Sequence, residues 1–359
     1  MANKYYNLTK IKNFADKHGA TYRLIIGQRS NGKTYACLRE GLKKYFETGL
    51  KIAYVRRYKE DITKPNLETL FNPHIEYMTM LTGGKWNGFD YRSRQFRPMF
   101  IPDNDSDEPA KGGVICDTFS LSAWERQKGS DKGIYSMIIF DEFITRDSYL
   151  AHETDILLDV ISSIVRDREG VPVYMIANTV SQHCPYFAAF GFKIQDIKQG
   201  DIKQVSPLCV IEYCNATGKQ NNLSYFSAFG TNHGKMIMSG EWDFREYPTL
   251  YPRSHKDYNF HLRFFIVLSD RKIAGEVLTG ERGAFIYFYP FTGEIRKPST
   301  TIIYSGAIDD NVLHCTKVSD IPTSAHQIIR DLILAGKCFY SDNETGDGVN
   351  AFLTNGGAI

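Results

Sequence analysis

Residues 22–34, YRLIIGQRSNGKT, join a short apolar run to a glycine-rich turn, and residues 35–45 then place apolar side chains at helical spacing. This order predicts a strand, a tight turn and a helix. The turn matches GxxxxGK[ST], in which backbone N–H groups converge on phosphates at a helix N-terminus. The alternative is a glycine-rich turn that binds nothing. We expect a nucleotide to bind Gly27, Gln28, Arg29, Ser30, Asn31, Gly32, Lys33 and Thr34.

A second motif belongs to the same chemistry. Residues 134–140, IYSMIIF, form an apolar run that ends at Asp141 and Glu142. In nucleotide-binding α/β folds the carboxylate at such a strand end helps to hold Mg²⁺, which also binds the loop hydroxyl. We therefore assign Thr34 and Asp141 as metal ligands, Lys33 as a contact of the β- and γ-phosphates, and Glu142 as the general base that activates water.

Five further polar residues end predicted elements. Asn178 follows the apolar strand 171–177 and is either a γ-phosphate sensor or an ordinary strand cap. Arg166 and Arg168 close the predicted helix 155–165, where they are either arginine fingers for a neighbouring subunit or solvated charges favoured by the helix dipole. Arg56 and Arg57 end the strand 51–57 and are either exposed charges or contacts of phosphate or DNA.

Composition limits the class of protein. The chain has 359 residues, 42% hydrophobic and 23% charged, with a mean hydropathy of −0.33, which is typical of a globular protein of two or three domains. No apolar run approaches the roughly 18 residues of a membrane helix, and no secretory signal is visible, so we expect an intracellular protein. Residues 1–60 carry 14 Lys and Arg against 4 Asp and Glu, which suits either a polyanion or a solvated surface.

The periodicity divides the chain into three parts. Residues 1–205 alternate apolar strands and helices, which predicts an α/β domain with a central, mostly parallel sheet and an insertion of one or two hairpins at 61–109. Residues 206–247 are mixed and polar, and we expect a small linker subdomain there. Residues 248–359 contain a predicted antiparallel meander at 259–268, 272–278 and 283–289, a helix at 321–337 and a frayed tail at 341–359.

Acidic residues of this last part could indicate a metal-dependent nuclease, but we expect them to be solvated surface: Asp257, Asp270, Glu276 and Glu281.

Several segments in combination resemble the DNA-packaging ATPases of small phi29-like podophages. These segments are GQRSNGKT, YVRRYK (54–59), IIFDEFI (138–144), VRDRE (165–169) and the strand ending in Ala177-Asn178. The resemblance covers about the first 190 residues well, and the long 61–109 segment and the Gly-rich tail depart from the smaller members.

The resemblance implies an ASCE-type ring ATPase, commonly a homopentamer, that docks at the portal vertex of a procapsid in the infected cell and drives double-stranded DNA inward with ATP and Mg²⁺. It implies that Arg166 is a trans-acting finger, that Arg56 is a nucleotide-side arginine also working in trans, and that Asn178 is the sensor. A structural RNA is a further implied partner, and the C-terminal domain would be an RNase H-like nuclease fold without activity.

Two rival functions remain. A P-loop kinase or nucleotide switch without DNA activity explains the loop but not the adjacent Asp141-Glu142 pair or the β-rich C-terminal part. A structural adaptor with a vestigial nucleotide site does not explain why Lys33, Thr34, Asp141 and Glu142 are all present. The absence of an NKxD-type element favours adenine over guanine.

Overall fold

The chain forms two compact units in this computed structural model. The first contains Met1–Ile144, His152–Thr179 and Ala189–Glu241, and the second contains Thr145–Ala151, Val180–Ala188 and Trp242–Ile359. The structure describes residues 6–102, 108–126, 133–145, 149–150, 152–182, 184–215, 239–240, 242, 246–250, 257–268, 271–281, 283–295, 301–305 and 324–355.

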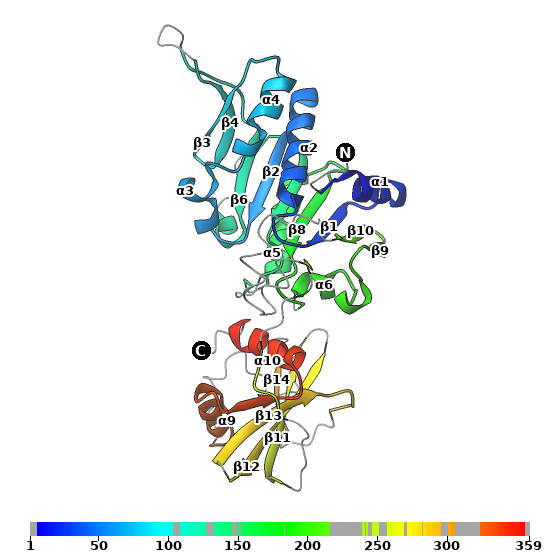
Figure 1. Ribbon diagram of the computed structural model, residues 1–359, viewed down its shortest axis with the longest axis vertical. Helices are drawn as coiled ribbons and strands as arrows, with labels where there is room; N and C mark the ends of the chain where they lie inside the picture. Colours follow the sequence, from blue (N-terminus) through cyan, green and yellow to red (C-terminus); the bar gives the residue numbers. More distant parts are fainter. Residues whose placement is uncertain are drawn as a thin grey trace. The chain divides into compact units, whose positions relative to one another are not determined.

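The first unit is built on a sheet of ten strands within the described residues (Figure 1). Its centre is parallel, in the order β6 (Cys116–Ser120), β2 (Lys51–Arg56), β7 (Tyr135–Asp141), β8 (Val173–Asn178), β1 (Tyr22–Gly27) and β10 (Cys209–Tyr213). Antiparallel strands complete both edges: β9 (Ile202–Ser206) beside β10, and β4 (Gln95–Phe100) beside β6, followed by β3 (Gly88–Arg92) and β5 (Ala110–Lys111). The predicted α/β unit with a mostly parallel sheet is confirmed.

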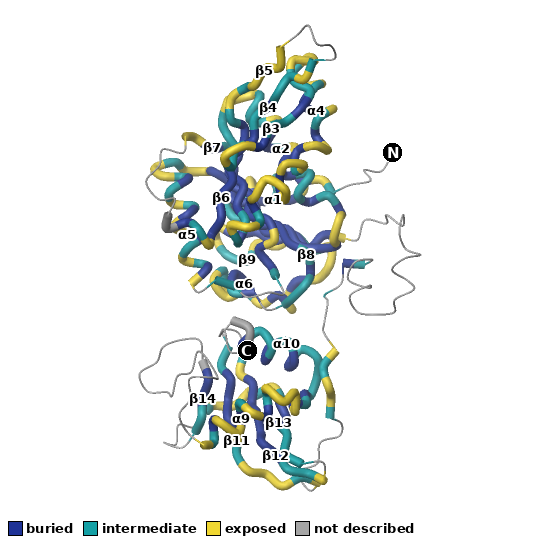
Figure 2. Tube along the Cα trace, turned by 90° about the vertical axis from the view of Figure 1, so that its left-hand side faces the viewer, coloured by how far each residue is buried: buried dark blue, intermediate teal, exposed yellow. Residues whose placement is uncertain are grey.

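Helices cover both faces of this sheet, which is why its central strands are continuously apolar. Helices α1 (Thr9–His18) and α2 (Lys33–Thr48) pack their apolar stripes on one face, where Ile11 and Leu38 join Ile52, Ile139 and Ile176 in one core. Helix α5 (Glu153–Val165) lies on the other side of the sheet (Figure 2). No helix in the described ranges has both the length and the hydropathy to cross a membrane.

The parallel order brings the carboxyl ends of four strands to one edge of the sheet. Gly27 of β1 is in register with Asn178 of β8. Asp141 of β7 is in register with Ile176, which also belongs to β8. Arg56 ends the neighbouring strand β2. Ligands of doubly wound sheets bind at this edge, so the fold places the sequence-predicted residues where such a site is expected.

The segment 61–109 contains the predicted hairpin, but also helices that the periodicity did not predict. Strands β3 and β4 are joined through Ser93 and Arg94, which both have positive φ (53° and 63°), as a two-residue hairpin turn requires. Before them lie η1 (Glu60–Ile62), α3 (Lys64–Leu67), η2 (Asn72–His74) and α4 (Ile75–Leu81). The hairpin extends the main sheet through β4 and β6.

The linker predicted from residue 206 onward is wrong in its first part. Residues 206–213 contain the end of β9 and all of β10, and β10 runs parallel to β1. Every residue of β10 is buried, so the short CVIEY run is a central strand whose signal is weak only because it is five residues long. Residues 216–238, which made up most of the predicted linker, lie outside the described residues.

The second unit contains a smaller, mixed sheet in the order β14-β11-β12-β13-β15. The predicted antiparallel meander is confirmed as β11 (Asn259–Val267), β12 (Lys272–Gly280) and β13 (Gly283–Pro290). Strand β14 (Ile302–Ser305) pairs parallel with β11, and β15 (Cys338–Tyr340) pairs parallel with β13. The predicted helix is α9 (Ser324–Leu334), and residues 321–323 lie outside the described part.

The frayed tail predicted at 341–359 is wrong for its described residues, because 343–355 form helix α10 (Asn343–Asn355). Asp342 caps this helix, since its Oδ1 accepts the backbone N–H of Thr345 at 2.7 Å. Val349, Phe352 and Leu353 then recur at helical spacing and enter the core of the second unit. The Gly- and Asn-rich composition concealed this pattern.

The solvated-surface interpretation is wrong for Glu276, which is fully buried on β12. Its Oε1 accepts hydrogen bonds from Arg263 Nη2 at 2.8 Å and from Tyr289 OH at 2.8 Å. Arg263 stands opposite Glu276 on the adjacent strand, so a cross-strand charge pair stabilises the buried carboxylate. Asp257 and Glu281 are exposed, as expected, and Asp270 lies outside the described residues.

Candidate functional site

The loop between β1 and α2 has the backbone of a phosphate-binding loop. Gly27, Ser30 and Gly32 all have positive φ, at 148°, 59° and 95°. Gly27 also lies close to the residue that follows β10, because a Cβ at Gly27 would lie 3.0 Å from Cys214 Cβ. Backbone N–H groups in such a concave turn at a helix N-terminus attract anions. The loop is therefore preformed, and both glycine positions of the motif have a conformational or steric reason.

Lys33, the first residue of α2, lies buried among oxygen acceptors. Four oxygens lie within hydrogen-bond distance of its three N–H donors: the carbonyl oxygens of Gly27 (3.2 Å) and Gln28 (2.7 Å), and the side-chain oxygens of Asn31 and Asn178, both at 3.2 Å. Burial lowers the pKa of this ammonium to about 8. The surrounding oxygens hold the Lys33 ammonium in position, and burial removes it from water. A buried, positioned cation is suited to bind phosphate strongly.

Thr34 and Asp141, the two predicted metal ligands, are in contact. Thr34 Oγ1 lies 3.2 Å from Asp141 Oδ2, although 107 positions separate the residues. The same carboxylate oxygen accepts the hydroxyl of Tyr54 on β2 at 2.7 Å. Tyr54 is buried, and burial together with the Asp141 charge raises the pKa of its phenol, so it remains a donor. Tyr54 begins the segment YVRRYK (54–59), but the sequence analysis assigned it no role at the metal site.

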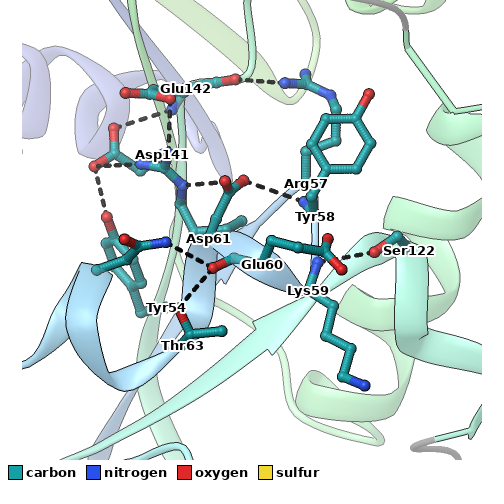
Figure 3. Close-up of polar contacts among 12 residues, drawn as sticks. Tyr54, Arg57, Tyr58, Lys59, Glu60, Asp61, Thr63, Ser122, Asp141 and Glu142 are labelled. Atoms are coloured by element: carbon teal, nitrogen blue, oxygen red, sulfur yellow. Dashed lines mark hydrogen bonds and ion pairs between the residues drawn. The ribbon is translucent and has the colours of Figure 1, made fainter.

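Glu142 follows the strand in a strained backbone conformation, with φ of 60°. Its N–H donates to Ile176 O at 2.8 Å and approaches Asp141 Oδ1 at 3.0 Å. Its carboxylate is more than half exposed and forms an ion pair with Arg56, in which Nη2 and Oε2 are 2.7 Å apart (Figure 3). The sharp turn therefore directs Glu142 away from the buried Asp141 and toward the end of β2.

Arg57 is neither an exposed charge nor available to DNA, because it is buried and binds three groups. It forms a bidentate pair with Glu153, with Nε–Oε2 at 2.8 Å and Nη2–Oε1 at 3.0 Å. It also donates to the carbonyl oxygen of Glu142 at 3.0 Å (Figure 3). A further hydrogen bond joins it to the carbonyl oxygen of Phe143 at 2.9 Å. Arg57 thus joins the end of β2 and the start of α5 to the turn that carries Glu142. Glu153 was missed because it lies 96 residues away along the chain.

Side chains from both motifs line one cavity of about 230 Å³ at this edge of the sheet. The lining residues are Ser30, Asn31, Gly32, Lys33, Thr34, Tyr35, Asp141, Glu142, Ala177 and Asn178. Asn178 is thus placed beside Lys33, as expected of a strand-end polar group. Gln28 is buried in the loop and Arg29 is exposed. The backbone of Gln28 packs against Gly240, where a Cβ would lie only 2.8 Å from its nitrogen.

Arg166 is not brought to this cavity. Arg168, two residues on, donates to Tyr135 O at 2.7 Å, and Tyr135 begins β7 whereas Asp141 ends it. Helix α5 has 13 residues and so spans about 20 Å between Glu153, near Glu142, and Arg166. Arg168 is a structural residue, since it also binds Ile164 O and Val165 O. Arg166 therefore lies at the opposite edge of the sheet from the loop of its own chain.

The donor set suits a nucleotide with a hard cation. Mg²⁺ prefers oxygen ligands and keeps waters or phosphates in most positions, so one hydroxyl and one carboxylate are an ordinary protein contribution. Thr34 Oγ1 and Asp141 Oδ2 already lie within 3.2 Å of each other, next to the Lys33 ammonium. The residues present fit Mg²⁺ bound to the phosphates of a nucleotide.

The chain is similar to known proteins in sequence and in fold. The family model described as Podovirus DNA encapsidation protein (Gp16) matches residues 3–310. The DNA packaging protein of Bacillus phage B103 is 29% identical over 223 residues, which are 61% of this chain and 63% of that protein. The chain spans less than two thirds of the length of the curated relatives it matches.

Two solved structures share the fold over almost the whole chain. The Phi-28 gp11 DNA packaging motor has a TM-score of 0.57 at 15% identity and covers 99% of this chain and 98% of that one. The bacteriophage Phi-29 viral genome packaging motor assembly has a TM-score of 0.59 at 20% identity and covers 99% and 100%. At these identities the likeness establishes the fold alone.

Proposed function

The chain belongs to the family of podovirus DNA encapsidation proteins (Gp16), and we propose that it is an ATP-driven motor that moves double-stranded viral DNA into a preformed procapsid. The observation that carries the proposal is the meeting of Lys33, Thr34, Asp141 and Glu142 around one cavity at the carboxyl edge of a parallel sheet. Membership of a DNA encapsidation family supports movement of DNA into the procapsid, and ATP hydrolysis at this site would supply the energy.

Within that function, we assign tasks to the loop and to five side chains of the cavity. The loop N–H groups and Lys33 would hold the phosphates. Thr34 and Asp141 would hold Mg²⁺, which would neutralise charge on the transferred phosphoryl group. Glu142 orients water and takes its proton, because its carboxylate borders the cavity without being buried in it. Asn178, within hydrogen-bond distance of Lys33, senses the γ-phosphate.

Arg56 contacts two of the acidic residues to which this chemistry is assigned. Its ion pair with Glu142 engages the proposed base, so catalysis requires that the pair loosen or that the free Glu142 oxygen act. The Arg56 guanidinium also lies 3.9 Å from Asp141 Oδ2. The phosphates of a nucleotide bound between Asp141 and Lys33 would therefore compete with Glu142 for this guanidinium. Arg56 thus contacts Glu142 within its own chain. The family resemblance suggests that Arg56 acts in trans, and this role stays a prediction.

The assembly that we propose is a ring, with five copies as the working number, docked on the portal of the procapsid in the infected bacterium. Arg166 would act on the nucleotide of the next copy, since it cannot reach its own. DNA would be held through its phosphates, because a packaging motor must accept any sequence. A structural RNA remains a proposed further partner.

For the second unit we propose a nuclease-like fold that does not cut nucleic acid. The support is Glu276, whose buried carboxylate is bound by Arg263 and Tyr289 and so is not available to a metal ion. The comparisons give no support to the alternative of a P-loop kinase or nucleotide switch, and that alternative leaves the adjacent Asp141-Glu142 pair unexplained.

The test is ATP hydrolysis by the full chain with and without double-stranded DNA. We expect DNA to raise turnover of the wild type, and Glu142→Gln to lower it by at least about a hundredfold while ATP still binds. Glu68→Gln, an exposed change at the end of α3, is the control and should leave turnover unchanged. If DNA did not change the turnover of the wild type, the proposal of a DNA-translocating motor would be wrong. Full activity in Glu142→Gln would contradict only the assignment of Glu142 as the general base.

A further inference from the structure

A residue far along the chain packs against the start of the phosphate loop. Gly240 is buried, and a Cβ at this position would lie 2.8 Å from the backbone nitrogen of Gln28, 3.0 Å from its Cβ and 3.1 Å from its Cα. A side-chain carbon cannot approach a main chain this closely, so only glycine fits against the loop. Gly240 also has a φ of 72°, in the left-handed region that favours glycine. Two independent features therefore require a glycine here.

The carbonyl oxygen of Gly240 is fixed by the hydroxyl groups of two buried residues. It accepts hydrogen bonds from Tyr213 OH at 2.8 Å and from Thr179 Oγ1 at 3.0 Å. Tyr213 is the last residue of β10, and Thr179 directly follows β8. These two strands flank β1, the strand that leads into the loop at Gly27. The ends of neighbouring strands thus hold Gly240 beside the first turn of the loop.

Gln28, the residue that Gly240 contacts, helps to hold the phosphate-binding lysine. The Gln28 carbonyl oxygen lies 2.7 Å from Lys33 Nζ, which is the shortest of the four oxygen contacts of that ammonium. The backbone that continues from Gln28 carries the N–H groups of the loop. A binding site of this kind needs its donors within about 0.5 Å of the productive position. A shift of the Gln28 backbone therefore changes phosphate binding through both the lysine and the loop.

We propose that Gly240 is a positioning residue for the phosphate loop and acts through the backbone of Gln28, against which two hydroxyl groups hold it. The inference rests on the proposed function, because it takes the loop as the site of the ATP phosphates. It adds a form of regulation to that site. The first unit ends at Glu241 and the second continues from Trp242, so Gly240 lies just before the chain enters the second unit. The affinity for nucleotide therefore depends on whether this connection is docked on the loop.

The experiment is calorimetric titration of the full chain with Mg-AMP-PNP, a slowly hydrolysed ATP analogue, and with Mg-tripolyphosphate. Gly240→Ala must displace the loop or the connection, and we expect it to weaken the binding of both ligands by about ten- to a hundredfold. Tripolyphosphate has no base, so an equal loss for the two ligands places the effect at the phosphates.

The matched control is Gly191→Ala. Gly191 has a similar φ of 76°, and in the described part of the chain a Cβ there would meet no atom within 4 Å beyond its sequence neighbours. This variant therefore carries the same kind of backbone cost without a contact to the loop. Both affinities should stay within about twofold of the wild type.

Removal of the two hydroxyl groups tests the same contact without adding an atom. Tyr213→Phe and Thr179→Val each remove one hydrogen bond to Gly240 and should each lower both affinities by about three- to tenfold. Thr179→Ser keeps the hydroxyl and should stay within about twofold of the wild type. These variants keep the proposal testable if Gly240→Ala does not fold. A merely structural role would lower the free energy of unfolding, measured by urea denaturation, and leave the affinities of the folded protein unchanged.

Linkage provides a second readout. If docking of Gly240 strengthens nucleotide binding, bound nucleotide strengthens the docking by the same factor. Mg-AMP-PNP should therefore slow amide hydrogen exchange in the peptide that contains Gly240, and Tyr213→Phe should reduce this effect.

Unchanged affinities in folded Gly240→Ala, or in both Tyr213→Phe and Thr179→Val, would overturn the proposal. Equal losses in Gly240→Ala and Gly191→Ala would do so too, as would a loss for Mg-AMP-PNP alone or hydrogen exchange at Gly240 that nucleotide does not change. In each of these cases a wild type that binds both ligands leaves the proposed function intact. A wild type that binds neither ligand would reject the phosphate site, and with it the proposed function as well.

Discussion

At the scale of single residues, the Lys33 ammonium makes nucleotide binding dependent on pH. Its pKa of about 8 in the free chain means that the cation is lost as pH rises through 8, and a neutral amine no longer attracts phosphate. Bound phosphates favour the cation and raise its pKa in the complex. We expect kcat/KM for ATP to fall above about pH 8 while kcat stays level to a higher pH, measured between about pH 6.5 and 10.

The Lys33 prediction has a direct control. Lys33→Arg carries a guanidinium that does not titrate in this range, so its weaker activity should lack the basic limb. A kcat/KM that is level to about pH 10 in the wild type would contradict the lowered pKa.

Tyr54 provides a second prediction, about the metal. Its hydroxyl donates to the Asp141 oxygen that Thr34 also contacts, so it orients that carboxylate. Groups that orient metal ligands commonly affect metal affinity by about 10- to 100-fold. We expect Tyr54→Phe to raise the Mg²⁺ concentration for half-maximal ATP hydrolysis by about tenfold, with a smaller effect on kcat at saturating metal.

Tyr91→Phe is the matched control for Tyr54→Phe. Tyr91 is also buried and donates its hydroxyl, but to Ile62 O rather than to a site residue. Its loss should change stability without changing the Mg²⁺ dependence. If both variants shift the Mg²⁺ dependence equally, Tyr54 does not position Asp141.

At the scale of elements, the turn after β7 is held by one buried charge pair. Arg57, directly after β2, and Glu153 of α5 have side chains only 5% and 1% exposed, and Arg57 also binds the two carbonyl groups of that turn. Removal of one partner leaves the other charge buried without compensation, which costs about 3–5 kcal/mol. We expect Glu153→Ala to lower the free energy of unfolding of the first unit by about this amount, measured by urea denaturation.

A surface pair gives the comparison for this prediction. Lys43 and Glu47 form an exposed i,i+4 pair on α2, for which Glu47→Ala should cost at most about 0.5 kcal/mol. Similar losses for Glu153→Ala and Glu47→Ala would show that the Arg57 pair does not hold the turn.

Arg57→Lys should also reduce ATP turnover, because a lysine cannot bind Glu153 in two places and the carbonyl groups as well.

At the scale of the whole molecule, the proposed function requires that a second copy of the chain complete the site. Helix α5 places Arg166 about 20 Å from the turn that carries Glu142. We expect Arg166→Ala and Glu142→Gln each to abolish DNA-stimulated hydrolysis, and mixtures of the two to recover part of it. In a mixed ring, an intact Glu142 can meet an intact Arg166 from its neighbour.

The double variant Glu142→Gln/Arg166→Ala is the control for mixing, because it supplies neither group and should restore nothing. Mixtures that never exceed the sum of their components would contradict a site shared between copies.

The sequence by itself determined the local chemistry: the strand-loop-helix around Lys33, the strand ending at Asp141 and Glu142, and the meander of the second unit. Each is encoded in a contiguous run whose periodicity or glycine positions follow from backbone geometry alone. Helix α10 was also encoded locally, in the Asp342 cap and the spacing of Val349 and Phe352, but its composition concealed it.

Tertiary structure alone decided the rest. The Arg57–Glu153 pair, the Tyr54 contact with Asp141, the Tyr35–His74 stack and the burial of Glu276 all depend on residues that are not neighbours in the chain. Their energies depend on which groups the packed sheet and helices exclude from water, and one-dimensional spacing contains no information about that exclusion. For the same reason the lowered pKa of Lys33 follows from its enclosure in the folded loop and not from the motif that contains it.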